Sequence, residues 1–382
     1  MTEAERVDQL FEAWNTKDSP GCAVAVMRDG EVIYKRGFGM ANLGHGVAIG
    51  PSTVFHSASV SKQFTAFAIL LLSAEGKLSL DDVVHLYVPS LPDFGVPITL
   101  RHLMQHTSGL RDHWELLSLA GRRYSKDLIT DDDILAVVSR QQDLNFQPGD
   151  EYLYCNTGYA LVAQVLKRVS GQSLRAFTSA RIFEPLGMSN TFFRDNYAEV
   201  IRNVAEGYVD TERGVEISDT NLDTVGATSL LTTVEDLALW DEDFYHHRVG
   251  GPAIIARMVD RGRLNDGSDI DYASRLGLGT YRGLAIVEQP AATPASAPIS
   301  SAFPSSISRW RSLPISGRSC RATSHRGSPI SIWHICCSRC QSKCRTRSRN
   351  PTPMHWNCLP AITPNQNWPA ALPALWRIRG SY

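Results

Sequence analysis

The stretch Phe55-His56-Ser57-Ala58-Ser59-Val60-Ser61-Lys62-Gln63-Phe64-Thr65-Ala66-Phe67 decides the fold of this chain. After Ser59, apolar residues recur at the spacing of a helix that is buried over most of its circumference; they are Phe64, Phe67, Ala68, Leu70, Leu71 and Leu72. The pattern therefore predicts a core helix that opens at Ser59.

Ser59 and Lys62 stand three residues apart, so a helix places both side chains on one face. A serine hydroxyl becomes a good nucleophile when a base takes its proton, and a lysine acts as that base once burial or positive charge lowers its pKa. The helix N-terminus also offers N–H groups to an oxyanion. An N-cap serine followed by a surface lysine is the plain alternative. A lysine in the first turn of a core helix is expected to be buried, which is rare for lysine, and this favours the functional interpretation.

The length of 382 residues suffices for one large domain or two interlocked ones. A formal net charge of -1 implies neither nucleic acid nor a membrane surface as partner. The start, Met1 to Arg6, lacks the basic and apolar segments of a signal peptide, and no run of about 18 apolar residues occurs. We therefore expect a cytoplasmic protein.

The composition changes abruptly after Glu288. All 39 acidic residues lie at or before Glu288, whereas the segment from Gln289 to Tyr382 carries 12 of the 38 Lys and Arg residues, 12 of the 20 prolines and 6 of the 8 cysteines. An acid-free run of this length is very rare in ordinary sequence. We therefore divide the chain into a folded domain at 1–288 and an aberrant tail at 289–382.

Within the first part, strands are predicted at both ends with helices between them, which indicates an α/β fold. The expected elements are a helix at 7–14, a hairpin at 22–35 with an Asp-Gly turn, a helix capped by Thr99 and stopped by Gly109, helices at 130–138 and from Asn156 to Gly171, a helix capped near Thr233, and a second hairpin at 276–288.

A second motif, Tyr154-Cys155-Asn156, lies in the turn before a predicted helix, 95 residues after Ser59. Together, Ser59-x-x-Lys62 and Tyr154-x-Asn156 resemble the serine β-lactamase and D,D-peptidase (penicillin-binding protein) superfamily, and more narrowly its class C and esterase-like branch. The segments His106-Thr-Ser-Gly-Leu110, Pro148-Gly149, Asn156-Thr-Gly-Tyr159 and Pro185-Leu-Gly-Met188 also resemble that family. The resemblance runs from about Glu3 to Glu288.

The resemblance implies a β-lactamase-like fold, with an antiparallel sheet flanked by helices and an inserted, mostly helical subdomain. It implies that Ser59 is the acylated nucleophile, Lys62 its partner in proton transfer, Tyr154 a phenolic proton shuttle and Asn156 a hydrogen-bond donor to the substrate. The substrate would be a small molecule or short peptide: a β-lactam, a D-amino-acid peptide or a small ester. No metal or organic cofactor is expected, and the oligomeric state stays open.

The third motif of this family, a Lys or His followed by x-Gly, is missing. His106-Thr-Ser-Gly109 precedes Tyr154 and ends a helix, so it does not replace the motif. The family motif belongs just past Glu288, where the sequence is Gln289-Pro290-Ala291-Ala292, and proline disfavours a central strand.

Re-reading the codons permitted by Gln289 to Pro304 one frame over supplies His-Ala-Gly at this point. We therefore hypothesise a frame slip that removes the last strands and a C-terminal helix, and with them the third motif. The alternative function is a non-catalytic or inactive product of the same family.

The tail has its own alternatives. Cys336, Cys337, Cys340 and Cys344 with His334 fit a zinc site only loosely, because no second C-x-x-C pair accompanies them. Arg345, Arg347 and Arg349 are of a type that contacts phosphate. We favour a disordered extension over both.

Overall fold

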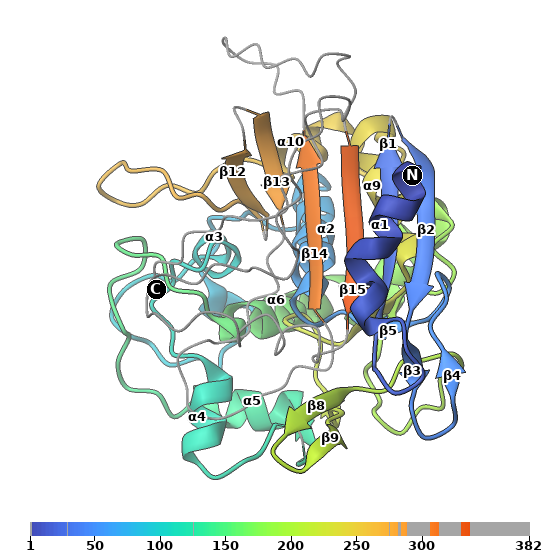
Figure 1. The fold of residues 1–382 in the computed structure, drawn as a ribbon. Helices are drawn as coiled ribbons and strands as arrows, with labels where there is room; N and C mark the ends of the chain where they lie inside the picture. Colours follow the sequence, from blue (N-terminus) through green and yellow to red (C-terminus); the bar gives the residue numbers. More distant parts are fainter. Residues whose placement is uncertain are drawn as a thin grey trace.

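A six-stranded antiparallel sheet forms the middle layer of the molecule (Figure 1). The computed structural model describes residues 2–288 apart from 29, 125, 275, 282 and 283, and in addition the strands at 306–312 and 330–336. In hydrogen-bonded order the strands are β12 (Gly277–Tyr281), β13 (Leu284–Glu288), β14 (Ser306–Ser312), β15 (Ile330–Cys336), β1 (Cys22–Arg28) and β2 (Glu31–Phe38). Both predicted hairpins are present, and strands from the two ends of the chain share one sheet.

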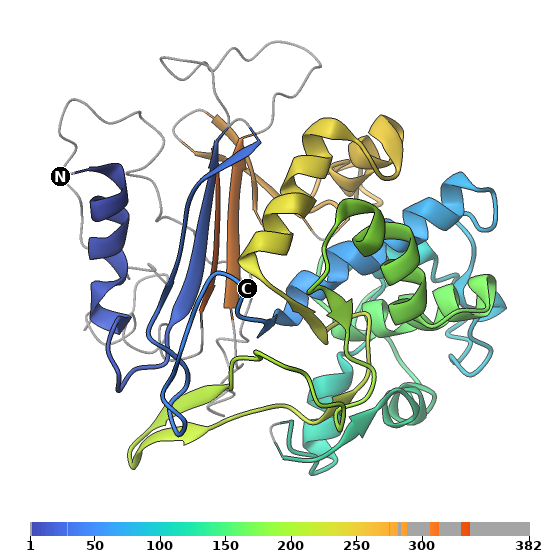
Figure 2. The ribbon, with the colours of Figure 1, turned by 90° about the vertical axis from the view of Figure 1, so that its right-hand side faces the viewer.

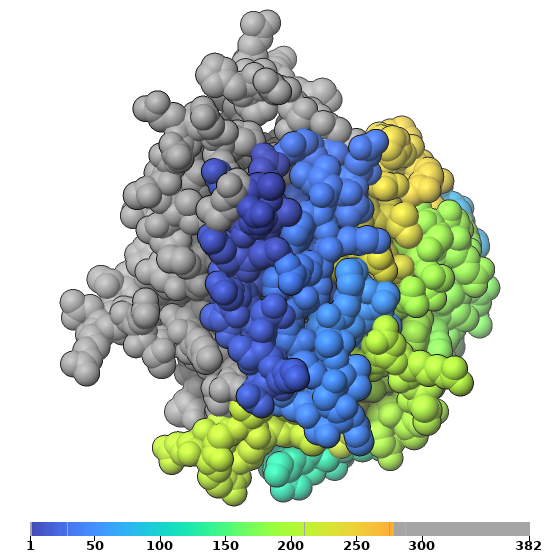
Figure 3. Space-filling model, turned by 45° about the vertical axis from the view of Figure 1, so that its right-hand side comes forward, coloured from blue at the N-terminus to red at the C-terminus, as the bar shows by residue number. Residues whose placement is uncertain are grey.

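Both faces of strand β1 are buried. Successive side chains of a strand point to opposite sides of the sheet, so β1 contributes residues to two apolar clusters. Cys22, Val24 and Val26 form a small cluster with Trp14 and with Phe11 of helix α1 (Glu3–Phe11). The alternate residues, including Ala23 and Ala25, belong to the main core on the other side. Figure 2 shows α1, in dark blue, on one side of the sheet and the central helices on the other. In Figure 3, α1 and the exposed strand β2 contribute to one continuous blue surface.

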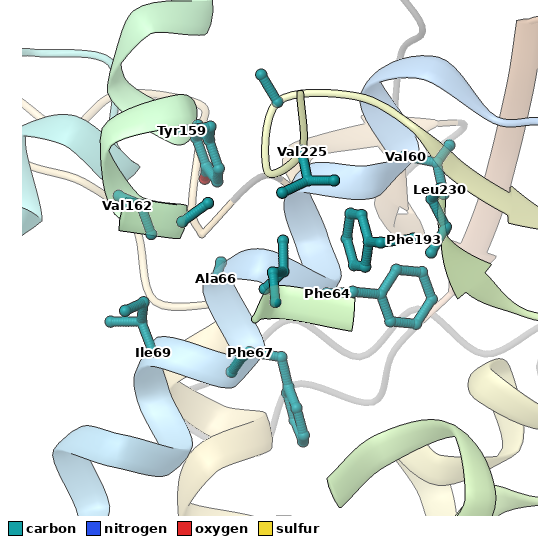
Figure 4. Packing of buried hydrophobic residues seen from close by; sticks show 14 of the residues in the cluster. Val60, Phe64, Ala66, Phe67, Ile69, Tyr159, Val162, Phe193, Val225 and Leu230 are labelled. Carbon is teal, nitrogen blue, oxygen red and sulfur yellow. The ribbon is translucent and has the colours of Figure 1, made fainter. Parts of the chain in front are cut away.

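Helix α2 (Ser61–Ala74) is the centre of the main core. Every residue from Ser61 to Leu72 is buried, as expected for a helix that is apolar on most sides. Phe64 and Phe67 pack against Trp240 of α9 (Val234–His246), and their ring centroids lie 4.7 and 5.0 Å from that of Trp240. Figure 4 shows Phe64 beside Phe193, in the same cluster as Val60. Burying each such side chain stabilises the fold by about 1.5–3 kcal/mol.

The other helices are α3 (Leu100–Met104), α4 (His113–Leu119), α5 (Asp131–Val138), α6 (Asn156–Ser170), α7 (Leu174–Thr178), α8 (Glu184–Leu186) and α10 (Gly251–Met258). Among them, α6, α7 and α10 pack against α2, and α3, α4 and α5 pack against α6. Thr99, Thr130 and Thr233 cap α3, α5 and α9 through their side-chain oxygens, so these predicted helix starts are confirmed. These three threonines therefore set where helices α3, α5 and α9 begin.

The predicted end of the Thr99 helix is wrong. Helix α3 ends at Met104, and the left-handed residue that follows is His106, with φ +59°. Gly109 also has a positive φ, +71°, but lies further along the chain, where a β-carbon would stand 2.0 Å from the carbonyl oxygen of Phe146. Glycine is thus required at 109 by a close approach of two backbones rather than by the helix end.

The remaining strands are short. They are β3 (Met40–Asn42), β4 (Val47–Ala48), β5 (Phe55–His56), β6 (Ile129–Thr130), β7 (Phe192–Phe193), β8 (Tyr208–Thr211), β9 (Gly214–Ile217), β10 (Leu222–Asp223) and β11 (Leu230–Thr232). Strands β5, β11 and β7 form a three-stranded sheet. This small sheet matters for function because β5 leads into the turn that carries Ser59.

The central sheet differs from the expectation that its last strands are missing. Strand β14 pairs with β13, and β15 pairs with both β14 and β1, so the facing edges of β13 and β1 have hydrogen-bonding partners. The sequence of β15, Ile-Ser-Ile-Trp-His-Ile-Cys, is rich in the β-branched and aromatic residues that strands favour. The expected C-terminal helix and the site of the third motif lie outside the described residues, and the frame slip stays a prediction.

Candidate active site

Ser59 lies in a tight turn between β5 and α2. The turn, Ala58–Val60, is a single turn of 3-10 helix that runs directly into α2, so the α-helix predicted to open at Ser59 begins two residues later, at Ser61. Ala58 has φ +45°, which is unusual for a residue other than glycine and often marks functional sites. Leu230 of β11 holds the turn, because its carbonyl accepts from Ser57 and its N–H donates to Ser61 Oγ.

Lys62 is fully buried, and its amine has three hydrogen-bond acceptors. Nζ donates to Ser59 Oγ at 3.1 Å, to Asn156 Oδ1 at 2.8 Å and to the carbonyl oxygen of Ala227 at 2.7 Å. Three acceptors match the three N–H bonds of an ammonium ion. They also compensate for burying the charge, which would otherwise be costly. Nζ further lies 5.0 Å from the centre of the Tyr154 ring, within range of a cation–π contact.

Tyr154 and Asn156 stand at the N-terminus of α6, as the sequence predicts. The Tyr154 hydroxyl lies 2.7 Å from Ser59 Oγ, a hydrogen bond in which either oxygen can donate. Ser59, Tyr154 and Asn156 are half-buried, so the group lies next to solvent. The structure thus brings together all four residues singled out in the sequence. The arrangement can take a proton from Ser59 Oγ through the Tyr154 phenolate or through the neutral Lys62 amine.

Asp112 fixes the orientation of the Asn156 amide. Its Oδ2 accepts from the Asn156 backbone N–H at 2.5 Å and from Asn156 Nδ2 at 2.8 Å, while Oδ1 accepts from the N–H of Trp114 and caps α4. Because Nδ2 faces a carboxylate, Oδ1 of the same amide must face Lys62. Sequence reasoning missed Asp112. Its only local signal is that of an N-cap, since the contact with Asn156 joins residues 44 positions apart.

Two buried histidines near the site are neutral at physiological pH. Burial lowers the pKa of His113 to about 4; Asp112 opposes this shift and the positive charge of Lys62 adds to it. Burial and then Arg194 lower the pKa of His56 to about 3. His56 accepts from the backbone N–H of Ser229 through Nε2, so it braces the segment next to Ala227 without carrying charge. The buried positive charge at the site therefore rests on Lys62.

No metal centre or membrane span emerges from the part of the chain that the structure describes. There, no three His, Cys, Asp or Glu side chains gather in a way that could hold a metal ion. The cysteines of the zinc alternative lie outside the described side chains. None of the described helices is both long and apolar enough to cross a membrane.

Residues 7–286 match the family model described as beta-lactamase. The chain belongs to the beta-lactamase family. The match ends within two residues of Glu288, where the acid-free segment follows. Both the family and the β-lactamase-like fold predicted from the motifs are therefore confirmed.

Curated relatives include a penicillin-binding protein and a D-aminopeptidase. Penicillin-binding protein 4* of Bacillus subtilis (strain 168) is 31% identical over 292 residues, covering 71% of this chain and 62% of that protein. The D-aminopeptidase of Brucella anthropi is 31% identical over 259 residues, covering 66% of this chain and 48% of that protein. The chain thus spans less than two thirds of the length of these relatives.

Solved structures share the fold at lower identity. The octameric penicillin-binding protein homologue from Pyrococcus abyssi has a TM-score of 0.67 at 24% identity, covering 86% of this chain and 72% of that one. EstCE1, a hydrolase with promiscuous acyltransferase activity, has a TM-score of 0.63 at 23% identity, covering 87% and 93%. At these identities the likeness speaks for the fold alone.

Proposed function

We propose that this protein hydrolyses amide or ester bonds through an acyl-enzyme on Ser59. The observation that carries the proposal is the hydroxyl of Ser59, placed 2.7 Å from the Tyr154 phenol and 3.1 Å from the Lys62 amine. A serine flanked by two groups that exchange protons is an activated nucleophile. The relatives named above include a D-aminopeptidase, which supports the same class of bond as substrate.

In the first step, Ser59 Oγ attacks the carbonyl carbon of the substrate while its proton passes either to Tyr154 as a phenolate beside the Lys62 ammonium, or to Lys62 in its neutral amine form. The bond between Oγ and carbon forms, and the carbonyl oxygen becomes an oxyanion. The positive end of the α2 dipole lies at the turn that carries Ser59, which favours negative charge there. Lys62, held by three acceptors, stabilises the negatively charged phenol or serine oxygen.

The tetrahedral intermediate then collapses, and the bond to the leaving group breaks. The amine or alcohol departs with the proton that Ser59 had lost, which leaves an ester on Ser59. A water molecule repeats the attack on that ester, gives its proton to the same pair and releases the acid. The side chains thus return to their starting state, and no cofactor is consumed. The substrate amide or carbonyl would receive a hydrogen bond from Asn156, whose Nδ2 carries a second N–H beyond the one given to Asp112.

The test is acylation and turnover by the purified chain beside a Ser59→Ala variant. A fluorescent penicillin reports labelling, and p-nitrophenyl acetate reports turnover. Labelling or turnover that is lost in Ser59→Ala is the expected result. Equal background in both proteins would refute the proposal. Comparing a penicillin, a D-amino-acid amide and the ester at equal concentration then ranks the substrate classes.

A non-catalytic product is the second candidate, and the end of the family match near Glu288 favours it. A family member without the third motif lacks one oxyanion donor, and loss of such a donor lowers kcat by about 10²–10³. Genomic sequencing across the codons for Val287 to Ala291 tests the frame slip. An intact template that encodes Gln-Pro-Ala-Ala, with relatives that share the tail, would end that idea. If the slip is real, restoring the frame should raise turnover by about that factor.

A further inference from the structure

His106 takes no part in the proton transfers described above, although its ring packs against Tyr154, which does. It follows α3, is only 1% exposed and adopts φ +59°, a left-handed conformation that is uncommon outside glycine. An unusual backbone conformation in a buried position needs surrounding contacts to maintain it. These contacts lead to Tyr154.

His106 binds the chain on both sides of Tyr154. The backbone N–H of Leu153 donates to the carbonyl oxygen of His106 at 2.9 Å. The backbone N–H of Cys155 donates to Nδ1 of the His106 ring at 3.1 Å. A backbone N–H can only donate, so Nδ1 is the acceptor and the neutral ring carries its proton on Nε2. One residue therefore fixes the backbone before and after the phenol, across 49 positions of sequence.

The imidazole also packs against the Tyr154 ring. The two ring centres are 4.5 Å apart at an angle of 43°. The buried rings of Tyr159 and Tyr272 also pack against this imidazole, with ring centres 5.3 and 5.0 Å from its centre. Aromatic rings at these separations attract one another and restrict each other's rotation. The phenol is thus held in its plane as well as along its backbone.

We propose that His106 is the positioning residue that holds the Tyr154 hydroxyl on Ser59 Oγ. This inference rests on the proposed function, in which Tyr154 passes the proton of Ser59 to the leaving group. A displaced phenol would impair mainly the leaving groups that need a proton in order to depart. Ethoxide is such a group, whereas p-nitrophenolate leaves without one.

Two variants separate the hydrogen bond from the volume of the ring. His106→Asn tolerates a positive φ and places an amide oxygen where Nδ1 stands, so Cys155 keeps its acceptor. His106→Phe keeps an aromatic ring but offers no acceptor. Thermal melting of both proteins checks that each is folded. Tyr154→Phe, alone and combined with His106→Phe, serves as the reference for a lost phenol.

For His106→Phe we expect kcat on an ethyl ester to fall at least about tenfold more than kcat on the matching p-nitrophenyl ester, as general acid catalysis is worth about 10²–10⁴. The double variant should be no slower than Tyr154→Phe, and His106→Asn, which loses the ring contact but keeps the acceptor for Cys155 N–H, should lose less kcat than His106→Phe. Equal losses on both esters, losses that multiply with those of Tyr154→Phe, or an Asn variant as damaged as the Phe variant would each overturn the assignment.

If the protein shows no turnover, the proposed function fails. A spectroscopic measurement then still tests the positioning role of His106. Carbon-13 at Cζ of tyrosine reports the surroundings of each phenol in the resting protein, and Tyr154→Phe identifies the Tyr154 signal. We expect that signal to move further in His106→Phe, which removes the acceptor for Cys155 N–H, than in His106→Asn, which keeps it. A signal that moves in neither variant would refute the positioning role.

Discussion

Replacing Asp112 with serine should separate the capping of α4 from the orientation of Asn156. Serine is as good an N-cap as aspartate, so the bond from Trp114 N–H is kept. The two bonds from Asn156, at 2.5 and 2.8 Å, are lost because the shorter side chain does not reach them. A hydrogen bond to a charged group contributes about 1.5–3 kcal/mol. If that contribution acts only in the transition state, by aligning the Asn156 amide on the substrate, its loss lowers kcat by roughly 10- to 150-fold.

The assay is steady-state hydrolysis of p-nitrophenyl acetate, with urea unfolding in parallel. Ser173→Ala is the control, because it removes the N-cap of α7, whose oxygen accepts from Ala176 N–H, and touches no group at Ser59. We expect the control to lose about 1 kcal/mol of stability with kcat unchanged. Suppose that Asp112→Ser keeps kcat within twofold of the parent while Ser59→Ala abolishes turnover. The carboxylate would then not control the Asn156 amide, and the reasoning fails.

Two further predictions concern stability. Histidines titrate near pH 6.5 in the unfolded chain, whereas the folded pKa values are about 4 for His113 and about 3 for His56. As pH falls from 6.5 towards 4 the unfolded chain therefore binds protons first, and each histidine lowers the free energy of unfolding by about 1.4 kcal/mol per pH unit. His113→Asn should reduce proton uptake on unfolding at pH 5 by about one, and unchanged uptake would contradict a neutral His113. Gly109→Ala should destabilise the fold by several kcal/mol more than the roughly 1–2 of Gly121→Ala, since both have positive φ but only 109 meets the Phe146 carbonyl. Equal urea midpoints for the two glycine variants would rule out that close approach.

Local patterns were enough to predict most elements and to single out four residues that lie together in the fold, Ser59, Lys62, Tyr154 and Asn156. The spacing of Ser59 and Lys62 places both on one side of a helix turn, and their 3.1 Å hydrogen bond follows from it. Thr99, Thr130 and Thr233 mark helix starts because a cap acts within three residues of itself. Such signals are readable in the sequence because the interacting groups are close along the chain.

Three features of the site were decided only by the tertiary structure. The carboxylate that orients Asn156 lies 44 positions from it, the imidazole that accepts from Cys155 N–H lies 49 positions from it, and the Ala227 carbonyl lies 165 positions from Lys62. No helical or strand period links residues at such distances, since contact between them depends on how whole elements pack. The helix end assigned to Gly109 failed for the same reason. The conformations of His106 and Gly109 are set by Cys155 and Phe146, which meet them only in the folded chain.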